Sequence, residues 1–340
     1  MSRRFAGALF ALVPAYACMA YASASAAPCR LVAATSGSDR NKGTLAQPLR
    51  TVQRLADKLK SGQLGCVRGG VYQEELRINH GGRSAAKRLT IESYGGERAT
   101  LVGRIYIPQG SSHVTIAQMN LNGRNGSKLP SPTVDSEDAV FSRDDVTNEH
   151  TGICFILGSN SYGRAERTTI DGNRIHDCGI EPSHNQDHGI YLSASDGVRI
   201  TDNVIFRNVD RGIQLFPDAQ GTVIEHNVID GNGEGVLFSG DGATSSNTRV
   251  EFNLITNSKL RYDVESYYPN GTPPGTNNIV RNNCVFGGAQ GTIGSQKGYM
   301  ATLNKAVDPQ YANPAVGNFS IPQGNRCAGY LAAATPLAHF

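Results

Sequence analysis

The sequence predicts an all-β solenoid, and two internal repeats together with the composition lead to that fold class. Segments in which Gly precedes Ile or Val recur at Gly189, Gly212 and Gly235, each 23 residues after the last. A fixed period indicates a repeat architecture, in which each unit buries its apolar face only against its neighbours. The 340 residues include 39 glycines, no tryptophan and 18% charged residues, which suits a turn-rich β protein.

The second repeat places an asparagine three positions after one aliphatic residue and two positions before another. Its five asparagines are Asn173, Asn203, Asn227, Asn253 and Asn283. Asparagine tolerates the left-handed backbone of a tight turn. Its amide can also donate to the coil above and accept from the coil below. We therefore expect a stacked column of asparagines in the turns between strands.

The beginning of the chain predicts export. Residues 1–27 are typical of a secretory signal peptide, with Arg3 and Arg4 before an apolar stretch and small residues at the cleavage position. Its removal lowers the formal charge from +3 to about +1, which gives no reason to expect a nucleic-acid partner. No later stretch is apolar enough to span a bilayer. We expect a secreted or periplasmic monomer.

The cysteines fit that location. Without Cys18, an even number remains, which in an exported protein favours disulfides. Sequence alone allows many pairings. Along the chain the six fall into neighbouring couples, namely Cys29 and Cys66, Cys154 and Cys178, and Cys284 and Cys327. No CxxC or His/Cys spacing typical of a zinc site occurs.

The chain before the repeats predicts a cap. A short strand at residues 30–34 and a polar loop precede Val52, Leu55, Ala56 and Leu59, which have the spacing of an amphipathic helix. A single helix before many strands would cover the open first coil of a solenoid. We expect one domain over residues 28–328 with a cap at 28–65, a polar insertion near 125–149, irregular last coils at 308–320 and a tail at 329–340.

These segments also carry a family resemblance. Two motifs stand out, the opening Gly-Ser-Asp-Arg-Asn-Lys-Gly-Thr at residues 37–44 and the strand Cys-Val-Arg-Gly-Gly-Val-Tyr at 66–72. With these motifs and the repeats, the sequence resembles the right-handed parallel β-helix proteins of the pectate-lyase-like superfamily. The resemblance covers residues 30–328 and implies a right-handed, three-sheet solenoid with an N-terminal capping helix. The superfamily includes polysaccharide lyases, uronan epimerases, hydrolases and non-catalytic adhesins, so the fold does not assign an activity.

In the implied architecture, equivalent residues of adjacent coils lie about 4.8 Å apart. The residues that this stacking brings to one edge are His188, Arg211, Glu234 and Tyr262, with Asp187 and Asp210 beside them. The repeat accounts for Gly, Ile and Leu but does not require Asp-His in one coil and Asp-Arg in the next. We interpret this column as the candidate site, although a solvated ladder of ion pairs would give the same pattern.

The chemistry expected there is attack on an acidic polysaccharide. Removing the proton next to a uronate carboxylate requires that this carboxylate be neutralised. We expect Arg211 to bind the carboxylate, His188 to act as the base and Tyr191 as the acid toward the leaving oxygen. Asp187 and Asp210 would orient these groups or bind calcium, the one cofactor expected.

Further candidates and alternatives complete the hypothesis. The substrate-binding candidates are Gln214, Phe216, Lys259, Arg261, Tyr262, Glu265 and Tyr267. Elimination would make the enzyme a lyase, and reprotonation of the same carbon would make it an epimerase. One alternative is a glycoside hydrolase that uses paired carboxylates such as Asp210 and Glu234. The other is a non-catalytic glycan-binding or surface protein.

Overall fold

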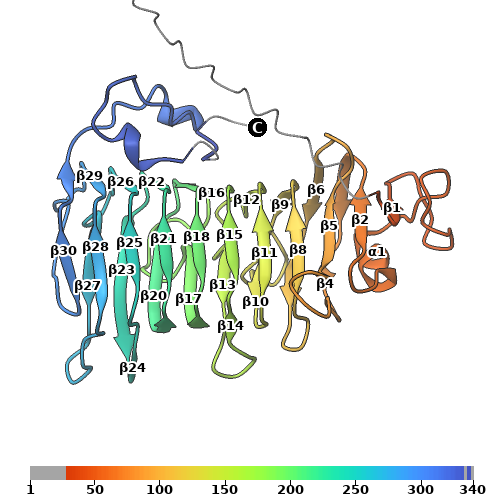
Figure 1. Cartoon of the computed structure of the whole chain (residues 1–340), viewed down its shortest axis with the longest axis horizontal. Coiled ribbons are helices and arrows are strands. Elements are labelled where there is room, and N and C mark those ends of the chain that lie inside the picture. The colour runs from red at the N-terminus through yellow and green to blue at the C-terminus, as the bar shows by residue number, and fades with distance from the viewer. Residues whose placement is uncertain (1–27, 333–334, 338–340) are drawn as a thin grey trace, which may run out of the picture.

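The computed structural model describes residues 28–332 and 335–337, and the predicted signal peptide at residues 1–27 lies outside them. Over this range the chain is a solenoid of parallel strands stacked along one axis, with α1 (Val52–Lys58) at its N-terminal end (Figure 1). Each regular coil contributes one short strand to each of three sheets. The predicted three-sheet architecture is confirmed.

The three sheets are named here by their strands. Sheet 1 contains β1 (Leu31–Ala33), β2 (Leu64–Val67), β5 (Leu89–Ser93), β8 (Val114–Ala117), β11 (Ala139–Ser142), β15 (Thr169–Asp171), β18 (Arg199–Thr201), β21 (Val223–Glu225), β25 (Arg249–Glu251), β28 (Asn278–Arg281) and β30 (Tyr299–Thr302). Sheet 2 contains β4 (Leu76–Arg77), β7 (Ile105–Ile107), β10 (Thr133–Val134), β13 (Phe155–Leu157), β17 (His188–Asp196), β20 (Arg211–Gln220), β23 (Glu234–Asp241) and β27 (Val264–Tyr267), with β14 (Ala165–Glu166) paired to β17 and β24 (Ala243–Thr244) antiparallel to β23. Sheet 3 contains β3 (Gly70–Gln73), β6 (Ala99–Val102), β9 (Asn120–Asn122), β12 (Asp145–Thr147), β16 (Arg174–His176), β19 (Val204–Phe206), β22 (Val228–Asp230), β26 (Leu254–Thr256), β29 (Cys284–Phe286) and β31 (Lys305–Ala306).

The expected polar insertion near residues 125–149 is wrong, because β10, β11 and β12 form a complete coil there. The strands of this coil are only two to four residues long. Asp144 also stands where later coils have asparagine, since its backbone N–H donates to Asn173 Oδ1 at 2.8 Å. The coil therefore lacks the pattern by which the others are recognised.

The asparagine column is present in the turns between sheets 1 and 3. Asn203, for example, donates from its backbone N–H and its amide to Asn227 Oδ1 at 2.9 and 3.0 Å. The expected left-handed backbone belongs to the residue before each asparagine, as at Asp202 and His226, where φ is 58° and 60°. The asparagine itself satisfies buried backbone groups of adjacent coils.

The N-terminal cap follows the predicted pattern. Val52, Leu55 and Ala56 are buried on the face of α1 that covers the first coil. Glu74 accepts hydrogen bonds from the first N–H groups of the helix, at 2.8 Å from Val52 N. These groups have no partner within the helix, so the carboxylate satisfies them.

Three disulfides join the neighbouring couples, namely Cys29 with Cys66, Cys154 with Cys178, and Cys284 with Cys327. Disulfides of this kind are typical of proteins outside the cytoplasm. Within residues 28–332 and 335–337, no helix is long and apolar enough to cross a membrane.

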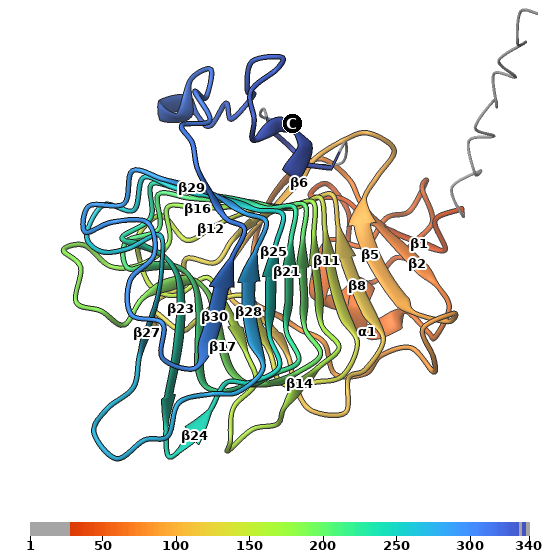
Figure 2. The same ribbon diagram turned by 60° about the vertical axis from the view of Figure 1, so that its left-hand side comes forward.

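The C-terminal segment differs from the expected final coils. After β31 it leaves the solenoid, forms short 3-10 helices at Pro314–Val316 and Ala328–Tyr330, and folds back over sheet 3 (Figures 1 and 2). The buried Arg174 donates to the backbone oxygens of Gly317 and Pro336 at 2.9 and 3.0 Å. Phe319 packs on Phe206 of β19. The segment therefore covers an apolar outer face of sheet 3.

Candidate functional site

The repeated glycines shape the corner at which sheet 2 begins. A Cβ at Gly212 would lie 2.8 Å from Ile229 Cγ2 and 2.9 Å from the backbone oxygen of Gly235. Only glycine lets the chain pass this close to the next coil. The side chain before the glycine can then contact the side chain two positions after the glycine. Arg211 Nη1, for example, donates to Gln214 Oε1 at 3.4 Å.

The register places the predicted residues in two adjacent columns. His188 pairs with Arg211, which pairs with Glu234, on β17, β20 and β23. The second column lies on the outer face of sheet 2 and runs through Tyr191, Gln214, Leu237 and Glu265. The 23-residue period therefore stacks His188, Arg211 and Glu234, whereas Glu265 joins the second column after a longer step of 28 residues.

Two arginines and two glutamates form the charged centre of these columns. Arg211 Nε donates to Glu234 Oε2 at 2.9 Å, and the two side chains are 7% and 2% exposed. Arg261 Nε lies 3.9 Å from the same oxygen and also pairs with Glu265 Oε1. Both glutamates are therefore buried under guanidinium groups, and the Arg261 side chain is 43% exposed.

Glu234 is a buried group whose ionisation the site strongly perturbs. Burial raises the pKa of Glu234, the Arg211 charge opposes this, and the neighbouring carboxyl group of Glu265 raises the pKa further. Its buried Oε1 has no donor among the described residues. A proton on Glu234 would allow it to donate a hydrogen bond to the neighbouring Glu265 carboxylate.

His188 is buried beside this centre and is neutral. Burial, and then the Arg211 charge, lower the pKa of His188 to about 3. Its ring packs edge-on against Tyr191 at 5.4 Å, and the side chain of Gln214 hydrogen-bonds to it. A buried imidazole with so low a pKa is a weak base, so its expected role as the proton acceptor loses support.

The loop before β17 covers Arg211. The backbone oxygen of Asn185 accepts from Arg211 Nη1 at 3.3 Å, and Asn185 Oδ1 accepts from Nη2. The Cys154–Cys178 disulfide holds the start of this loop. Two oxygens of the loop thus occupy guanidinium N–H groups in the way that a carboxylate would.

Asp187 and Asp210 organise this loop. Asp210 accepts from the backbone N–H groups of Gln186 and Asp187 at 2.6 and 2.7 Å and from the Ser183 hydroxyl. Burial opposes ionisation of Asp210, but these donors outweigh it and hold its pKa below the usual value. Asp187 Oδ2 accepts from Ile180 N–H at 2.8 Å. Both carboxylates therefore contact the loop.

The expected calcium site does not fit these contacts. Calcium requires about six to eight oxygen ligands, and both oxygens of Asp210 already accept hydrogen bonds. In the described part of the chain, no group of three or more His, Cys, Asp or Glu side chains is arranged to hold a metal ion. No role at this site is therefore assigned through a metal.

The remaining candidates divide into two groups. Phe216 stacks on Tyr191 at 6.3 Å on the outer face, and Tyr267 is exposed at the end of β27. Tyr262 lies against the segment containing Gly291 and Gly294. Lys259 instead lies beside Gly231 in the turn after β22, so the structure does not bring it to the charged centre.

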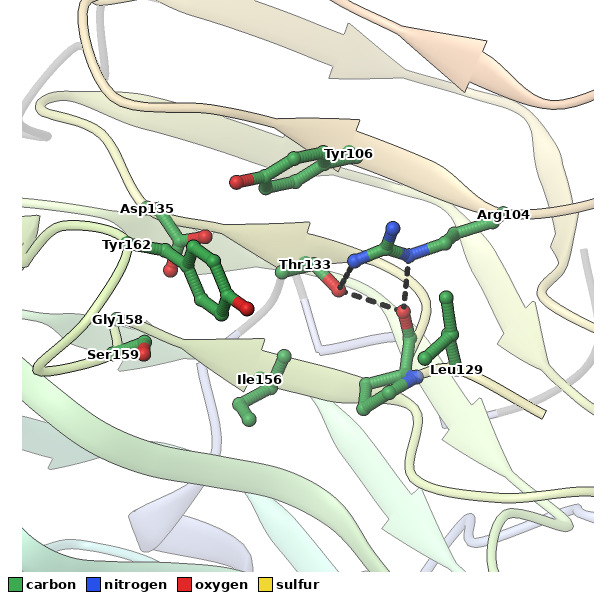
Figure 3. A pocket seen from close by; sticks show the side chains of 10 residues that line it. Arg104, Tyr106, Leu129, Thr133, Asp135, Ile156, Gly158, Ser159 and Tyr162 are labelled. Atoms are coloured by element: carbon green, nitrogen blue, oxygen red, sulfur yellow. Dashed lines mark hydrogen bonds between the residues drawn. The ribbon is translucent and has the colours of Figure 1, made fainter. Parts of the chain in front are cut away.

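Sequence reasoning missed Asn185 and a cavity elsewhere on sheet 2. Asn185 has no repeat partner, and only its position in the loop before Asp187 marks it. The cavity, of about 410 Å³, opens on the outer face of sheet 2 toward the N-terminal end (Figure 3). Its walls include Arg104, Tyr106 and Tyr162, which belong to coils outside the 23-residue repeat.

Comparisons with known proteins agree with this fold. Residues 105–285 match the family described as "Right handed beta helix region". A 73-residue segment is 33% identical to the uncharacterized protein YwoF of Bacillus subtilis (strain 168) and spans 22% of this chain and 15% of that protein.

Solved structures share the solenoid. The structure of pectate lyase Pel9A superimposes with a TM-score of 0.60 at 13% identity, covering 90% of each chain. A rhamnogalacturonan lyase has a TM-score of 0.53 at 12% identity, over 90% of this chain and 97% of that chain. The GH136 lacto-N-biosidase from Eubacterium ramulus has a TM-score of 0.51 at 11% identity, over 81% and 67%. At these identities the likeness shows the fold alone.

Proposed function

We propose that this chain, which belongs to the right-handed β-helix family, acts on an acidic polysaccharide by removing the C5 proton of a uronate residue. The observation that carries the proposal is the pairing of two arginines with two buried carboxyl groups at the edge of sheet 2. Lyases are among the proteins that share the fold.

The charge of the centre suits one carboxylate. If Glu234 and Glu265 share a proton, the pair carries one negative charge against the two positive charges of Arg211 and Arg261. His188 adds no charge at neutral pH, because its pKa is about 3. A single uronate carboxylate would neutralise the remaining positive charge. Arg261 is the more exposed cation and the one that an incoming carboxylate meets first.

Glu234 is the group best suited to accept the proton. Glu234 can accept a proton only in its ionised form, and in that form a carboxylate whose pKa is raised by burial is a stronger base than an ordinary one. When the C5 proton moves to Glu234, its electron pair spreads onto the uronate carboxylate, and the arginines stabilise the enolate formed. In a lyase the C4–O bond then breaks, a C4=C5 double bond forms, and Tyr191 donates its hydroxyl proton to the leaving oxygen. In an epimerase, the same carbon is protonated from the other side.

The hydrolase alternative has less support from the geometry. An inverting pair needs carboxyl groups about 6.5–9.5 Å apart on opposite sides of the bond. Glu234 and Glu265 lie within hydrogen-bonding distance of each other. Asp210 accepts three hydrogen bonds from the loop and its pKa is lowered, so it does not act as a proton donor.

The location expected for this activity is outside the cytoplasm. We infer a secreted or periplasmic protein, because the six described cysteines form three disulfides, which reducing conditions would open.

The experiment incubates the protein with polygalacturonate, with alginate and with neutral xylan in D2O. Ultraviolet absorbance reports the unsaturated product of elimination, and NMR reports deuterium at C5. We expect one of these signals on a uronan and none on xylan. Glu234→Gln should reduce it by at least about a hundredfold. Glu251→Gln is the matched control, since Glu251 is also buried and paired with an arginine, Arg281, but lies on sheet 1.

The other outcomes decide against the proposal. New reducing ends without unsaturation or deuterium would show a hydrolase. Uronan binding without turnover or exchange, unchanged in Glu234→Gln, would show a non-catalytic glycan-binding protein.

A further inference from the structure

The cavity seen in Figure 3 lies on the same outer face of sheet 2 as the charged centre. Tyr106, Thr133 and Ile156 are successive members of the outward column, which continues through Tyr191 to Gln214. Tyr106 and Gln214 are four coils apart, about 19 Å at about 4.8 Å per coil. The volume of about 410 Å³ falls within the range of small-molecule sites.

One wall of the cavity is a fixed aromatic ring. The guanidinium carbons of Arg77 and Arg104 each lie 4.7 Å from the ring centroid of Tyr106. The hydroxyl of Tyr106 hydrogen-bonds to the carboxylate of Asp135, which is buried. These contacts hold the ring in place before any ligand arrives, which lowers the entropy cost of binding.

Arg104 brings a positive charge to the cavity, and the nearby carboxylate of Asp135 offsets part of it. Its side chain donates to Pro130 O at 3.5 Å and to Thr133 Oγ1 at 3.4 Å, which are long contacts to neutral groups. Among the described residues, no carboxylate oxygen lies within 4.0 Å of its guanidinium nitrogens, whereas Arg164 and Arg211 have such partners. An anionic group of a ligand would therefore find a donor at this wall.

The rest of the lining is mostly apolar, with Leu129, Pro130 and Ile156, and includes Ser159 and a second tyrosine. Tyr162, in the loop between β13 and β14, is 68% exposed, and Figure 3 shows its ring across the cavity from Arg104. Reciprocal backbone hydrogen bonds between Ser159 and Gly163, at 2.8 and 3.0 Å, close this loop. With Ile156 as the floor, the cavity offers flat apolar surfaces of the kind that pack against the face of a sugar ring.

We propose that this cavity is a second binding site for a uronate residue, separate from the charged centre and on the same polysaccharide chain. Arg104 pairs with the uronate carboxylate, and Tyr162 and Ile156 pack against the ring. The identity of the ligand rests on the proposed function, but the site itself contains none of the residues that act on the C5 proton. A second site of this kind makes the protein bind polysaccharide chains more tightly when they are long enough to reach both sites.

The experiment measures binding of short and long oligogalacturonates by calorimetry, in a Glu234→Gln background that prevents turnover. Arg104→Gln and Tyr162→Ala should each raise the Kd of the long oligomer by about tenfold or more. Both should leave the turnover of short oligomers by the otherwise native protein unchanged. Tyr162→Phe, which keeps the ring, should bind nearly as the parent does, and methyl esterification of the long oligomer should abolish the effect of Arg104→Gln.

Arg83→Gln is the control, because it removes the same charge from an exposed residue outside the cavity. Unchanged binding of the long oligomer in both cavity variants would overturn the inference, as would an equal loss in Arg83→Gln.

If no uronan is turned over but the cavity variants lose binding, only the proposed function fails. If turnover is present and the variants bind normally, only the second site fails. If no uronan is bound or turned over, both fail.

Discussion

Arg211 Nε donates to Glu234 Oε2 at 2.9 Å in a pair that is almost fully buried. A buried ion pair is expensive to form, since both charges lose their hydration. Removing one partner costs more than removing both, because the other charge then remains buried without compensation. This pair therefore links the stability of the corner to the group that we propose takes the proton.

The first prediction concerns that link. Arg211→Met should lower the free energy of unfolding by about 3–5 kcal/mol, and adding Glu234→Gln should recover most of the loss. Urea unfolding measures both. Arg281→Met is the control, since Arg281 pairs with Glu251 but its side chain is 47% exposed. That variant should lose less than Arg211→Met, because water can reach the position that the Arg281 guanidinium leaves. Equal losses in the two arginine variants would contradict the prediction.

The second prediction concerns the loop over Arg211. Asp210→Asn should increase hydrogen exchange at the amides of Gln186 and Asp187, which donate to this carboxylate. The pKa of Asp210 is lowered in the folded state, so its stabilisation is present above about pH 4 and is lost as the pH falls through the lowered value. The wild-type loop should therefore lose protection on acidification, after correction for intrinsic exchange rates.

Asp196→Asn serves as the control for the loop. Asp196 is half-exposed and pairs with Arg164 at the far end of β17, so the Gln186 and Asp187 amides should exchange as in the wild type. Unaltered exchange in Asp210→Asn would show that other contacts hold the loop.

The periodic parts of the structure could be predicted because every coil repeats the same physical requirement. A column of asparagines recurs because each turn has the same buried backbone groups, and the stacking of His188 over Arg211 follows from the same step. The coil at residues 131–147 was missed because Asp144 replaces asparagine there. Spacing could not reveal the contact of Arg174 with Gly317, which lie 143 residues apart.

The sequence predicted which candidate residues are neighbours, but not their ionisation. Spacing gives the neighbours of His188, whereas its basicity depends on burial and on the charge of Arg211, which the sequence does not specify. The contact of Asn185 with Arg211 and the position of Tyr162 belong to loops, where no period applies.

The third prediction concerns calcium, which the sequence places at Asp187 and Asp210. Both oxygens of Asp210 and Oδ2 of Asp187 already accept hydrogen bonds from the loop, so excess chelator should leave the melting temperature and the turnover of uronan unchanged. Differential scanning calorimetry with and without chelator measures the first quantity. A lower melting temperature in chelator that calcium restores and magnesium does not would show that the loop rearranges to bind the ion.

The fourth prediction concerns Asp263, a buried residue just before β27. Burial raises the pKa of Asp263 to about 7, although Ser258 donates to its Oδ1 at 2.8 Å. A raised folded pKa means that its contribution to stability is complete below about pH 4 and is lost as the pH rises to about 7. Asp263→Asn should remove that loss, which is at most about 4 kcal/mol. Urea unfolding across this range tests it, with the exposed Asp241→Asn as control.

The fifth prediction uses the asparagine column itself. Asn227 donates from Nδ2 to Ile200 O at 2.8 Å and to Asn253 Oδ1 at 2.9 Å. Asn227→Asp removes these donors at neutral pH and buries a charge, so it should cost on the order of 2–4 kcal/mol. Asp144 shows the response of a carboxyl group in this column, since burial raises its pKa well above the usual value.

Protonation would restore one donor, so the Asn227→Asp variant should be less destabilised at acidic pH than at neutral pH. Stability would be retained below the unfolded pKa and lost as the pH rises through the raised folded one. Asn227→Ala, which has no titrating group, should lose the same free energy of unfolding at both pH values relative to the wild type. Urea unfolding of the two variants at each pH separates these cases. A loss in Asn227→Asp that does not vary with pH would mean that the column admits water or relaxes around the charge.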